Sequence, residues 1–333
     1  RRQRQMCIRD SIISSLMSMS LFKIYSKIAL LSPRIEVLLR QMYWYNHNLV
    51  SRYNPNTVSA SIFPVTDIHT VDFDAILERL EGWGVRKGSL LIVHSSYDSL
   101  KATGLSPLEI INKLRGLIGE EGTLAMPVIR HYKNEPSPIE KLKRDFVYPE
   151  CVYNPKRTPV VSGLLPTFLM RMPDAEISLH PLNPLCAIGP LAKDMMRHNI
   201  EGDIPSPHGI YSAWHFCVSH NAFVCSLGTD LRHHNTIGHV AEEAFGNWYW
   251  GDDDWYSVRN FRIEIERNNT IDLKVKERKA KWGMLHQAEL NRYKDLLDNR
   301  IIKSQRFDNV LVEFEESSKL INYLMSKNSR GCL

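Results

Sequence analysis

Apolar residues recur along the chain both at helical spacing and in short continuous runs, and the two patterns alternate from about residue 73. Phe73–Val85 has helical spacing and ends near Gly84, which predicts a helix with a glycine cap. Ser89–Ser96 is a short apolar run typical of a buried strand. Ser106–Gly119 opens with serine and proline, as helices often do, and Gly122–Ile129 is a second apolar run. This strand–helix–strand order predicts that the two strands are parallel.

The second half of the chain continues the alternation. We expect helices at Ser162–Met172, Asn235–Phe245 and Glu316–Met325, and strands at Ala222–Thr229 and Asp308–Phe314. Residues 130–160 and 246–260 are rich in Pro, Asn, Asp and aromatic residues, so we interpret them as long functional loops. The pattern therefore predicts an α/β fold with a mainly parallel or mixed sheet flanked by helices.

Residues 1–66 differ from the rest and are expected to form a basic, mostly helical N-terminal arm, followed by one main domain at 67–333. Residues 1–60 hold nine Lys and Arg against two acids, a net charge of +7, while the whole chain carries +5. The remaining residues therefore sum to −2. A nearly neutral body argues against a nucleic-acid-binding protein.

The arm contains an uncharged run, Ser11–Phe22, that is too short and too rich in serine for a transmembrane helix. It is interpreted either as a basic amphipathic helix touching a membrane surface or a partner, or as helices that pack on the main domain or form an oligomer contact. The second interpretation is preferred. The six cysteines are scattered, with no C-x-x-C pair, which is typical of free thiols in a reducing compartment. We expect a cytoplasmic protein, with a peripheral contact at the inner membrane as an alternative.

Four stretches place polar side chains or tight turns after predicted strands. Open α/β sheets build their sites at the carboxyl ends of strands, so these stretches are the candidates for chemistry. They are VHSS (Val93–Ser96), RTPVVSGLLP (Arg157–Pro166), LHPLNPLCAIGP (Leu179–Pro190) and LGTDLRHHNTIGHVAEE (Leu227–Glu243).

The segment His233–Glu243 gathers three histidines and two acids, and it allows three interpretations. Either of its first two histidines, with His239 and Glu242, could bind a metal ion, although the spacing matches no standard zinc motif. Asn235 or Thr236 is a suitable helix N-cap. Capping alone does not account for His239.

The third interpretation is acid–base chemistry. His239 and Glu242 stand three residues apart, so on a helix they share one face and the carboxylate can hold the imidazole. A histidine with a pKa near ~6.5, raised a little by a carboxylate, suits proton removal from an attacking amine. We expect this pair to be the chemical centre.

Together the stretches resemble the aminoglycoside 3-N-acetyltransferase family. The chain carries VHSS, GEEGTLAMP, RTPVVSGLLP, HPLNPLCAIG and NTIGHVAE in the family's order, and the resemblance runs from about Phe73 to near Leu324. It implies the family's fold, acetyl-CoA as acyl donor and no metal. It also implies His239 as general base with Glu242 orienting it, and it includes Thr236 among the catalytic positions.

The resemblance and the residue types suggest two further sets of site residues. The candidate cofactor-binding residues are His94, Ser95, Ser96, Arg157, Thr158, Ser162, Gly163 and His180. The candidate substrate-binding residues are Asn235, Glu243, Trp250, Asp252 and Asp253, because aromatic faces suit sugar rings and carboxylates suit cationic amines.

Several of these assignments have a structural alternative. Backbone amides near Ser95–Ser96 are expected to stabilise an oxyanion, but His94 and His180 could equally be bonded to nearby backbone for structure. Arg157 could meet a nucleotide phosphate or be a solvated charge.

The chain departs from the family pattern at two serines, which are Val160 and Pro184 here. In the family these serines lie near the cofactor, so Ser162 or Asn183 is expected to replace their hydrogen bonds.

The expected function is transfer of an acetyl group from acetyl-CoA to the amine of an amino sugar in cell-surface polysaccharide or sugar-nucleotide metabolism. The alternative is an aminoglycoside 3-N-acetyltransferase that confers antibiotic resistance. Two lesser alternatives are a metal-dependent hydrolase using the His233–Glu243 cluster and a non-catalytic acyl-CoA-binding protein. Neither nucleic acid nor a metal is expected as a partner.

Overall fold

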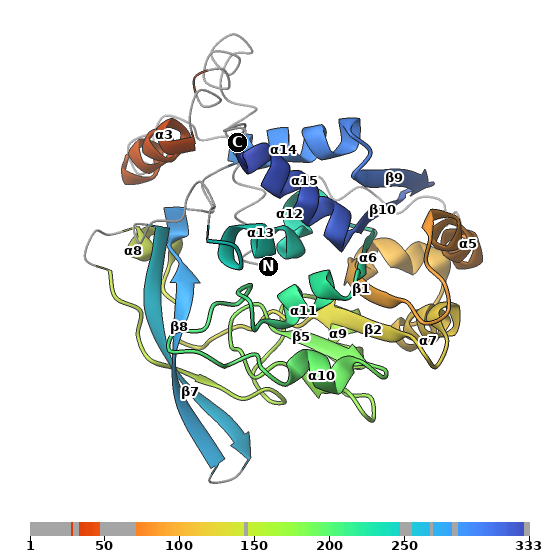
Figure 1. Ribbon diagram of the computed structural model, residues 1–333, viewed down its shortest axis with the longest axis horizontal. Helices are drawn as coiled ribbons and strands as arrows, with labels where there is room; N and C mark the ends of the chain where they lie inside the picture. Colours follow the sequence, from red (N-terminus) through yellow and green to blue (C-terminus); the bar gives the residue numbers. More distant parts are fainter. Residues whose placement is uncertain are drawn as a thin grey trace. The chain divides into compact units, whose positions relative to one another are not determined.

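The protein is described here by a computed structural model, which covers residues 28, 33–46, 71–142, 146–246, 255–266, 269–281 and 286–329 (Figure 1). The chain divides into two compact units. The first comprises residues 1–67, 137–146 and 280–292, and the second comprises residues 68–136, 147–279 and 293–333. The expected arm falls within the first unit, which contains the helices α3 (Pro33–Tyr45) and α8 (Pro138–Lys141). The uncharged run at residues 11–22 lies outside the described residues.

The second unit is built on a seven-stranded mixed sheet with the order β4-β5-β2-β1-β6-β10-β9. Its centre is parallel, since β1 pairs in parallel with both β2 and β6. The outer strands β5, β4, β10 and β9 pair antiparallel to their neighbours. The strands are β1 (Leu90–Ser95), β2 (Thr123–Pro127), β4 (Glu176–Ile177), β5 (Leu185–Ile188), β6 (Phe223–Leu227), β9 (Ile302–Phe307) and β10 (Val310–Glu316).

Two groups of helices accompany this sheet. One consists of α5 (Phe73–Trp83), α7 (Pro107–Ile118) and α9 (Leu164–Leu169), which pack on one another and on the strands. The other includes α11 (Ala213–Ser219), α13 (Val240–Glu243) and α15 (Ser317–Ser329), which also contact one another. The remaining short elements are α6 (Tyr97–Leu100), η1 (Lys101–Thr103), α10 (Ala192–Met196), α12 (Leu231–His234) and η2 (Thr236–His239). Residues of helix α14 (His286–Asp298) up to 292 are assigned to the first unit and those from 293 to the second. Among the described helices, none is long and apolar enough to cross a bilayer.

The best-defined helix of the unit, α7, shows why the local signals were informative. Ser106 accepts a hydrogen bond from the Glu109 amide while the Glu109 side chain accepts one from the Ser106 amide, which makes a capping box. Pro107 occupies the first turn, where its missing N–H costs nothing. At the end of α5, Gly84 adopts a φ of 122°, which favours glycine. The mixed α/β architecture and these helices are confirmed.

Strand alternation divides the residues of the sheet between its two faces. Leu91 and Val93 of β1, like Val312 and Phe314 of β10, belong to the hydrophobic core with α5, α7 and α9. Because successive side chains of a strand point to opposite faces, His94 of β1 lies on the other face. The same rule places Glu313 and Glu315 of β10 there, and both bind the segment that follows β6: Glu313 Oε2 accepts from the Leu231 amide at 2.7 Å, and Glu315 Oε2 accepts from Asn235 Nδ2 at 3.1 Å.

A second, three-stranded sheet was not predicted. Strand β3 (Cys151–Tyr153) pairs in parallel with β7 (Tyr256–Glu266), and β7 forms a long antiparallel hairpin with β8 (Asn269–Arg278), seen in Figure 1. The interpretation of residues 130–160 and 246–260 as loops was therefore wrong at 151–153 and 256–260, and also at 138–141, which form α8. Charged residues alternate with apolar ones in the hairpin, so that only one face is apolar, and Phe261 and Val275 reach a small core.

Arg259 of β7 is buried in this second sheet. Its guanidinium donates to Glu135 Oε2 at 2.7 Å and to Glu277 Oε2 at 3.0 Å. It also lies over the rings of Tyr148 and Phe261, at 4.7 and 4.8 Å from their centroids. Two carboxylates and aromatic faces compensate the cost of burying this cation, and they tie the loop after β2 to the hairpin.

Candidate active site

The candidate site begins in the segment between β6 and α13. Asp230 caps α12 by accepting from the His233 amide, and Asn235 caps η2 by accepting from the Gly238 amide at 3.2 Å. Asn235 therefore serves as the N-cap and holds Glu315 with its amide nitrogen, while Thr236 begins the 3₁₀ turn. The expected helix at 235–245 is shorter and broken, because η2 precedes the single turn of α13.

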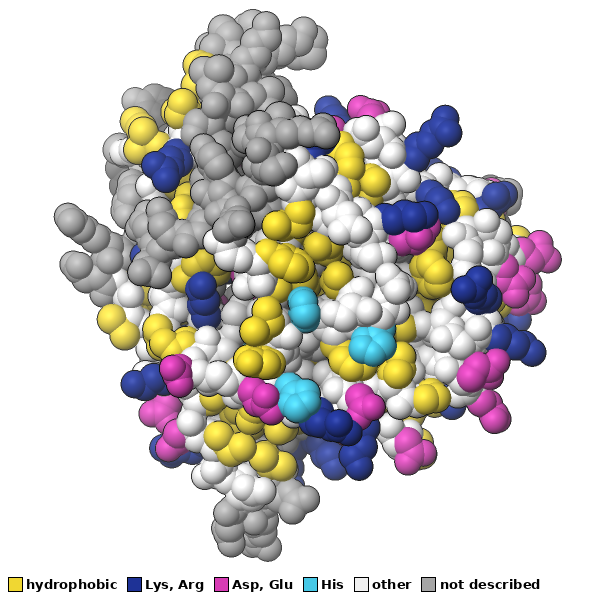
Figure 2. All heavy atoms as spheres, viewed as in Figure 1, with side chains coloured by type: hydrophobic (Ala, Val, Ile, Leu, Met, Phe, Trp, Pro, Cys, Tyr) yellow, Lys and Arg dark blue, Asp and Glu magenta, His cyan; other side chains and the backbone are white. Residues whose placement is uncertain are grey.

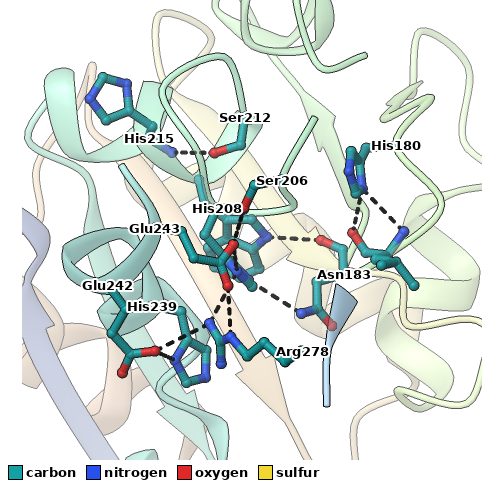
Figure 3. Close-up of polar contacts among 12 residues, drawn as sticks. His180, Asn183, Ser206, His208, Ser212, His215, His239, Glu242, Glu243 and Arg278 are labelled. Atoms are coloured by element: carbon teal, nitrogen blue, oxygen red, sulfur yellow. Dashed lines mark hydrogen bonds and ion pairs between the residues drawn. The ribbon is translucent and has the colours of Figure 1, made fainter. Parts of the chain in front are cut away.

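His239 and Glu242 face one another as the spacing predicted. His239 Nδ1 donates to Glu242 Oε2 at 2.9 Å (Figure 3). This bond places the proton on Nδ1, so Nε2 carries the lone pair of the neutral ring. The Glu242 side chain is 2% exposed, but that of His239 is 24% exposed. The pair thus combines a fixed carboxylate with an imidazole that solvent and small molecules reach.

The electrostatic expectation for His239 was wrong in sign. Burial is the main cause that lowers its pKa, to about 4, and the charge of Arg278 lowers it further, whereas Glu242 raises it. Sequence spacing revealed the carboxylate but neither the burial nor the arginine, which comes from β8. His239 is consequently neutral at pH 7 and able to accept a proton.

A second histidine–glutamate pair lies beside the first. Glu243 Oε2 accepts from both the amide and Nδ1 of His208 at 3.1 Å, and it also accepts from the Ser206 hydroxyl. Its other oxygen accepts from Arg278 Nε at 2.6 Å. The rings of His208 and His239 are 5.3 Å apart.

Only one member of this second pair, Glu243, was among the site residues expected from the sequence. Glu243, expected on the substrate, is fully buried among protein donors in Figure 3. His208, Ser206 and Arg278 were missed, because they lie 35 to 37 residues from Glu243 and belong to no recognised motif.

Aromatic rings connect the two pairs with the end of β1. The ring centroid of Trp214 in α11 lies 6.1 Å from that of His208 and 6.2 Å from that of His94, on which it stacks. The His234 centroid lies 6.0 Å from that of His94. His94 Nε2 and Ser95 Oγ are buried, and neither has a hydrogen-bond partner among the described residues. Unpaired buried polar atoms are costly, so these two atoms are candidate ligand contacts. Burial lowers the pKa of His94 to about 3, so its ring is neutral.

The expected oxyanion amide of Ser96 is not available. Its N–H donates to the Leu227 carbonyl at 2.9 Å, extending the parallel ladder between β1 and β6. An amide already bonded within the sheet stabilises no developing charge, so this part of the prediction was wrong.

The residues expected around the cofactor lie in several environments. Arg157 is exposed, and Thr158 accepts from the Asn154 amide through its hydroxyl. Ser162 Oγ donates to the Pro127 carbonyl at 2.7 Å and accepts from the Ile129 amide, which joins it to the end of β2. Gly163, with a φ of 116°, lies near the Ser95 carbonyl and is the N-cap residue of α9. The hydroxyls of Thr158 and Ser162 are thus engaged with backbone.

His180 has the structural role that was the alternative. Its Nε2 donates to the Pro205 carbonyl at 3.3 Å and its Nδ1 accepts from the Leu182 amide at 3.2 Å. The ring is buried, and burial lowers its pKa to about 4. His180 therefore fastens the loop before β5 to the loop that carries His208.

The remaining candidates concern metal binding and the acceptor loop. Within the described ranges, no group of three His, Cys, Asp or Glu side chains is arranged to hold a metal ion. His233 instead pairs with Asp230 at 2.8 Å. Trp250, Asp252 and Asp253 lie outside the described residues. On the face of the molecule shown in Figure 2, acidic and basic side chains are interspersed among the described residues.

Comparison with known proteins identifies the family of the chain. The sequence profile of the family "Aminoglycoside 3-N-acetyltransferase" matches residues 92–327, which include both histidine–glutamate pairs. The chain belongs to this family. Aminoglycoside N(3)-acetyltransferase III of Serratia marcescens is 32% identical over 180 residues, covering 51% of this chain and 63% of the relative. Aminoglycoside N(3)-acetyltransferase IV of Salmonella sp is 27% identical over 169 residues, covering 50% of this chain and 57% of the relative.

Solved structures of aminoglycoside acetyltransferases share the fold. The apoenzyme of AAC(3)-IVa superimposes with a TM-score of 0.59 at 21% identity, over 78% of this chain and 89% of the other. AAC-IIIb, solved with CoASH, gives a TM-score of 0.59 at 17% identity, over 79% and 97% of the two chains. In sequence, the matched segments span about three fifths of the curated relatives.

The two departures from the aminoglycoside 3-N-acetyltransferase pattern lie in backbone-paired positions. Val160 forms a bridge with Arg130, and the Pro184 carbonyl accepts from the Val128 amide at 2.8 Å. Asn183, expected to replace a serine, instead donates to His208 Nε2 at 3.2 Å and accepts from Trp214 through its carbonyl.

Stability is expected to fall on mild acidification. Burial holds the pKa of His94 near 3 and that of His180 and His239 near 4, so below about pH 6.5 the unfolded chain binds protons that the folded chain does not. Each such histidine lowers the free energy of unfolding by about 1.4 kcal/mol per pH unit between its unfolded and folded pKa. Urea unfolding at pH 7.5, 6, 5 and 4.5 measures the slope.

A variant pair isolates one of these histidines. His94→Gln is expected to reduce the slope by about one proton, whereas Trp214→Phe disturbs the same ring stack and leaves the slope unchanged. Equal slopes for His94→Gln and the native protein would show that His94 is not held neutral by burial.

Proposed function

We propose that the protein transfers the acetyl group of acetyl-CoA to an amino group of an aminoglycoside. The observation that carries the proposal is the bond of 2.9 Å from His239 Nδ1 to the buried Glu242 carboxylate, which leaves a partly exposed, neutral imidazole. The family and the two curated relatives described above, both named as aminoglycoside N-acetyltransferases, support the reaction. Solved relatives with CoASH and with a gentamicin support the donor and the acceptor class.

His239 is the proposed general base. In the overall reaction the amine nitrogen bonds to the acetyl carbon, the carbon–sulfur bond breaks and coenzyme A leaves as the thiol. His239 Nε2 accepts the proton that the attacking nitrogen loses, while Glu242 holds the ring and stabilises the imidazolium. The leaving sulfur needs little help from an acid, since thiols ionise near ~8.5.

His94 and Ser95 are the proposed contacts to the acetyl donor at the end of β1. Their buried Nε2 and Oγ atoms need hydrogen-bond partners, and a thioester carbonyl is an acceptor for either of them. The Ser96 amide is bonded to the Leu227 carbonyl within the sheet. In the proposed reaction the side chains of His94 and Ser95 therefore stabilise the oxyanion, in place of the backbone amides expected from the sequence.

The aminoglycoside acceptor is better supported than an amino sugar of cell-surface polysaccharide. The relatives are named for aminoglycosides, and AAC(3)-IVa structures contain a gentamicin or apramycin. The charges of the described site are also compatible with a cation, because Glu242 and Glu243 outnumber Arg278 and the histidines are neutral. The intact His239–Glu242 pair argues against a non-catalytic acyl-CoA-binding protein.

The test is thiol release from acetyl-CoA with separate panels of acceptors. We expect release that depends on gentamicin-type and apramycin-type aminoglycosides, and little with monoamino sugars or sugar nucleotides carrying a free amine. Mass spectrometry of the product is expected to show a single added acetyl group. Release with the sugar nucleotides alone would overturn the acceptor class, and the absence of release with every amine would overturn the function.

A further inference from the structure

Two consecutive carboxylates in the site serve two different histidines. Glu242 binds His239 and Glu243 binds His208, and both carboxylates are at most 2% exposed. Adjacent buried negative charges repel one another, and in the absence of a cation one of them would take up a proton. A protonated Glu242 would bind the His239 Nδ1–H more weakly, and a rotated Glu242 would release the ring.

The cation between them is Arg278. Its Nε donates to Glu243 Oε1 at 2.6 Å, and its Nη2 lies 3.4 Å from Glu242 Oε2 and 3.3 Å from His208 Nδ1. Figure 3 shows the guanidinium reaching both carboxylates beside the His239 ring. A planar guanidinium suits this arrangement, since its donors are fixed in a fork.

Arg278 comes from the sheet that the sequence did not reveal. It is the last residue of β8 and the cross-strand partner of Tyr256 in β7. The strand is also bonded to the site two residues before Arg278. The Lys276 amide donates to the carbonyl of Pro205 at 3.0 Å, and Pro205 directly precedes Ser206. The hairpin therefore delivers the arginine from a rigid backbone rather than from a free loop.

We propose that Arg278 is a positioning residue of the acyl transfer: it holds the Glu242 and Glu243 carboxylates so that Glu242 keeps the His239 ring oriented. The proposal rests on the function proposed above, in which His239 is the base. The groups that face His239 are Glu242, His208 and Arg278, and Tyr256 and Glu243 face Arg278. The charge of Arg278 opposes protonation of the imidazole, so its loss raises the pKa of His239.

The test compares Arg278→Gln and Arg278→Lys with Arg262→Gln. Arg262 is a matched control, because it lies on the same hairpin and pairs with Asp272 at 3.1 Å but is 49% exposed. We expect Arg278→Gln to lower kcat for acetyl transfer by about 10²-fold with a smaller change in KM, since misplacing a catalytic group by about 1 Å has that effect. The acid limb of its kcat/KM profile is expected at higher pH. Arg278→Lys is expected to recover part of kcat, and Arg262→Gln to match the native protein.

A second readout does not depend on turnover. The His239 imidazole nitrogens are followed by NMR during a pH titration of the native protein, Arg278→Gln, Arg278→Lys and Arg262→Gln. The proposal predicts a higher titration midpoint in Arg278→Gln, because the charge that opposes protonation of the imidazole is lost, and a smaller rise in Arg278→Lys, which keeps a cation but not the planar fork. Unchanged midpoints together with unchanged kcat would overturn the proposal. A native protein that turns over no amine, with the midpoint still shifted in Arg278→Gln, would overturn the proposed function and leave the coupling of Arg278 to His239 standing.

Discussion

Replacing His239 by glutamine is expected to reduce kcat/KM for acetyl transfer by about 10²–10⁴-fold, which is the usual contribution of a positioned base. Glutamine retains a polar side chain of similar reach and can still bond Glu242, but it accepts no proton at neutral pH. Binding of acetyl-CoA is expected to persist, since its proposed contacts His94 and Ser95 belong to β1, whereas His239 belongs to η2. Steady-state thiol release and calorimetric titration with acetyl-CoA measure the two effects separately.

The matched control for this variant is His198→Gln. His198 Nδ1 bonds Glu201 Oε1 at 2.6 Å with the same spacing of three residues, but both side chains are 52% exposed. The control is therefore expected to retain native activity. If His239→Gln also kept native kcat/KM, the general-base role would be lost, and if both variants lost activity equally, the effect would not belong to the site.

Replacing Arg259 by methionine is expected to lower the free energy of unfolding by about 3–5 kcal/mol, the cost of breaking a buried ion pair by removing one partner. The change removes the cation between Glu135 and Glu277 and its contacts with the rings of Tyr148 and Phe261. Methionine keeps much of the apolar stem, so the loss reports mainly the charge. Urea unfolding followed by tryptophan fluorescence and by circular dichroism gives the difference.

Arg262→Met serves as the control for Arg259→Met. Its partners Asp272 and Glu150 are solvent-exposed, and exposed pairs contribute only about 0–1 kcal/mol. A loss below about 1 kcal/mol for Arg259→Met would mean that the carboxylates and rings reorganise around the missing cation, and the second sheet would not depend on it. Because Arg278 is carried by the same hairpin, the destabilised variant is also expected to lose acetyl transfer.

The first sheet and its helices could be predicted because their signals are local. The serine, proline and glutamate of α7 lie within one turn, and the apolar run of β1 identifies a buried strand without reference to other elements. The second sheet gave a weaker signal. Charged residues alternate with apolar ones in β7 and β8, and β3 has only three residues, so no continuous apolar run revealed it.

The sequence by itself predicted the His239–Glu242 pair, since two residues three apart on a helical turn are neighbours on one face. It also determined the family, through motifs that keep their order. Only the tertiary structure brought His208 and Arg278 to Glu243, because those contacts join strands and loops about 35 residues apart. The tertiary structure likewise decided the sign of the His239 pKa shift. Desolvation depends on everything that packs around a ring, whereas spacing along the chain reveals only its nearest neighbours.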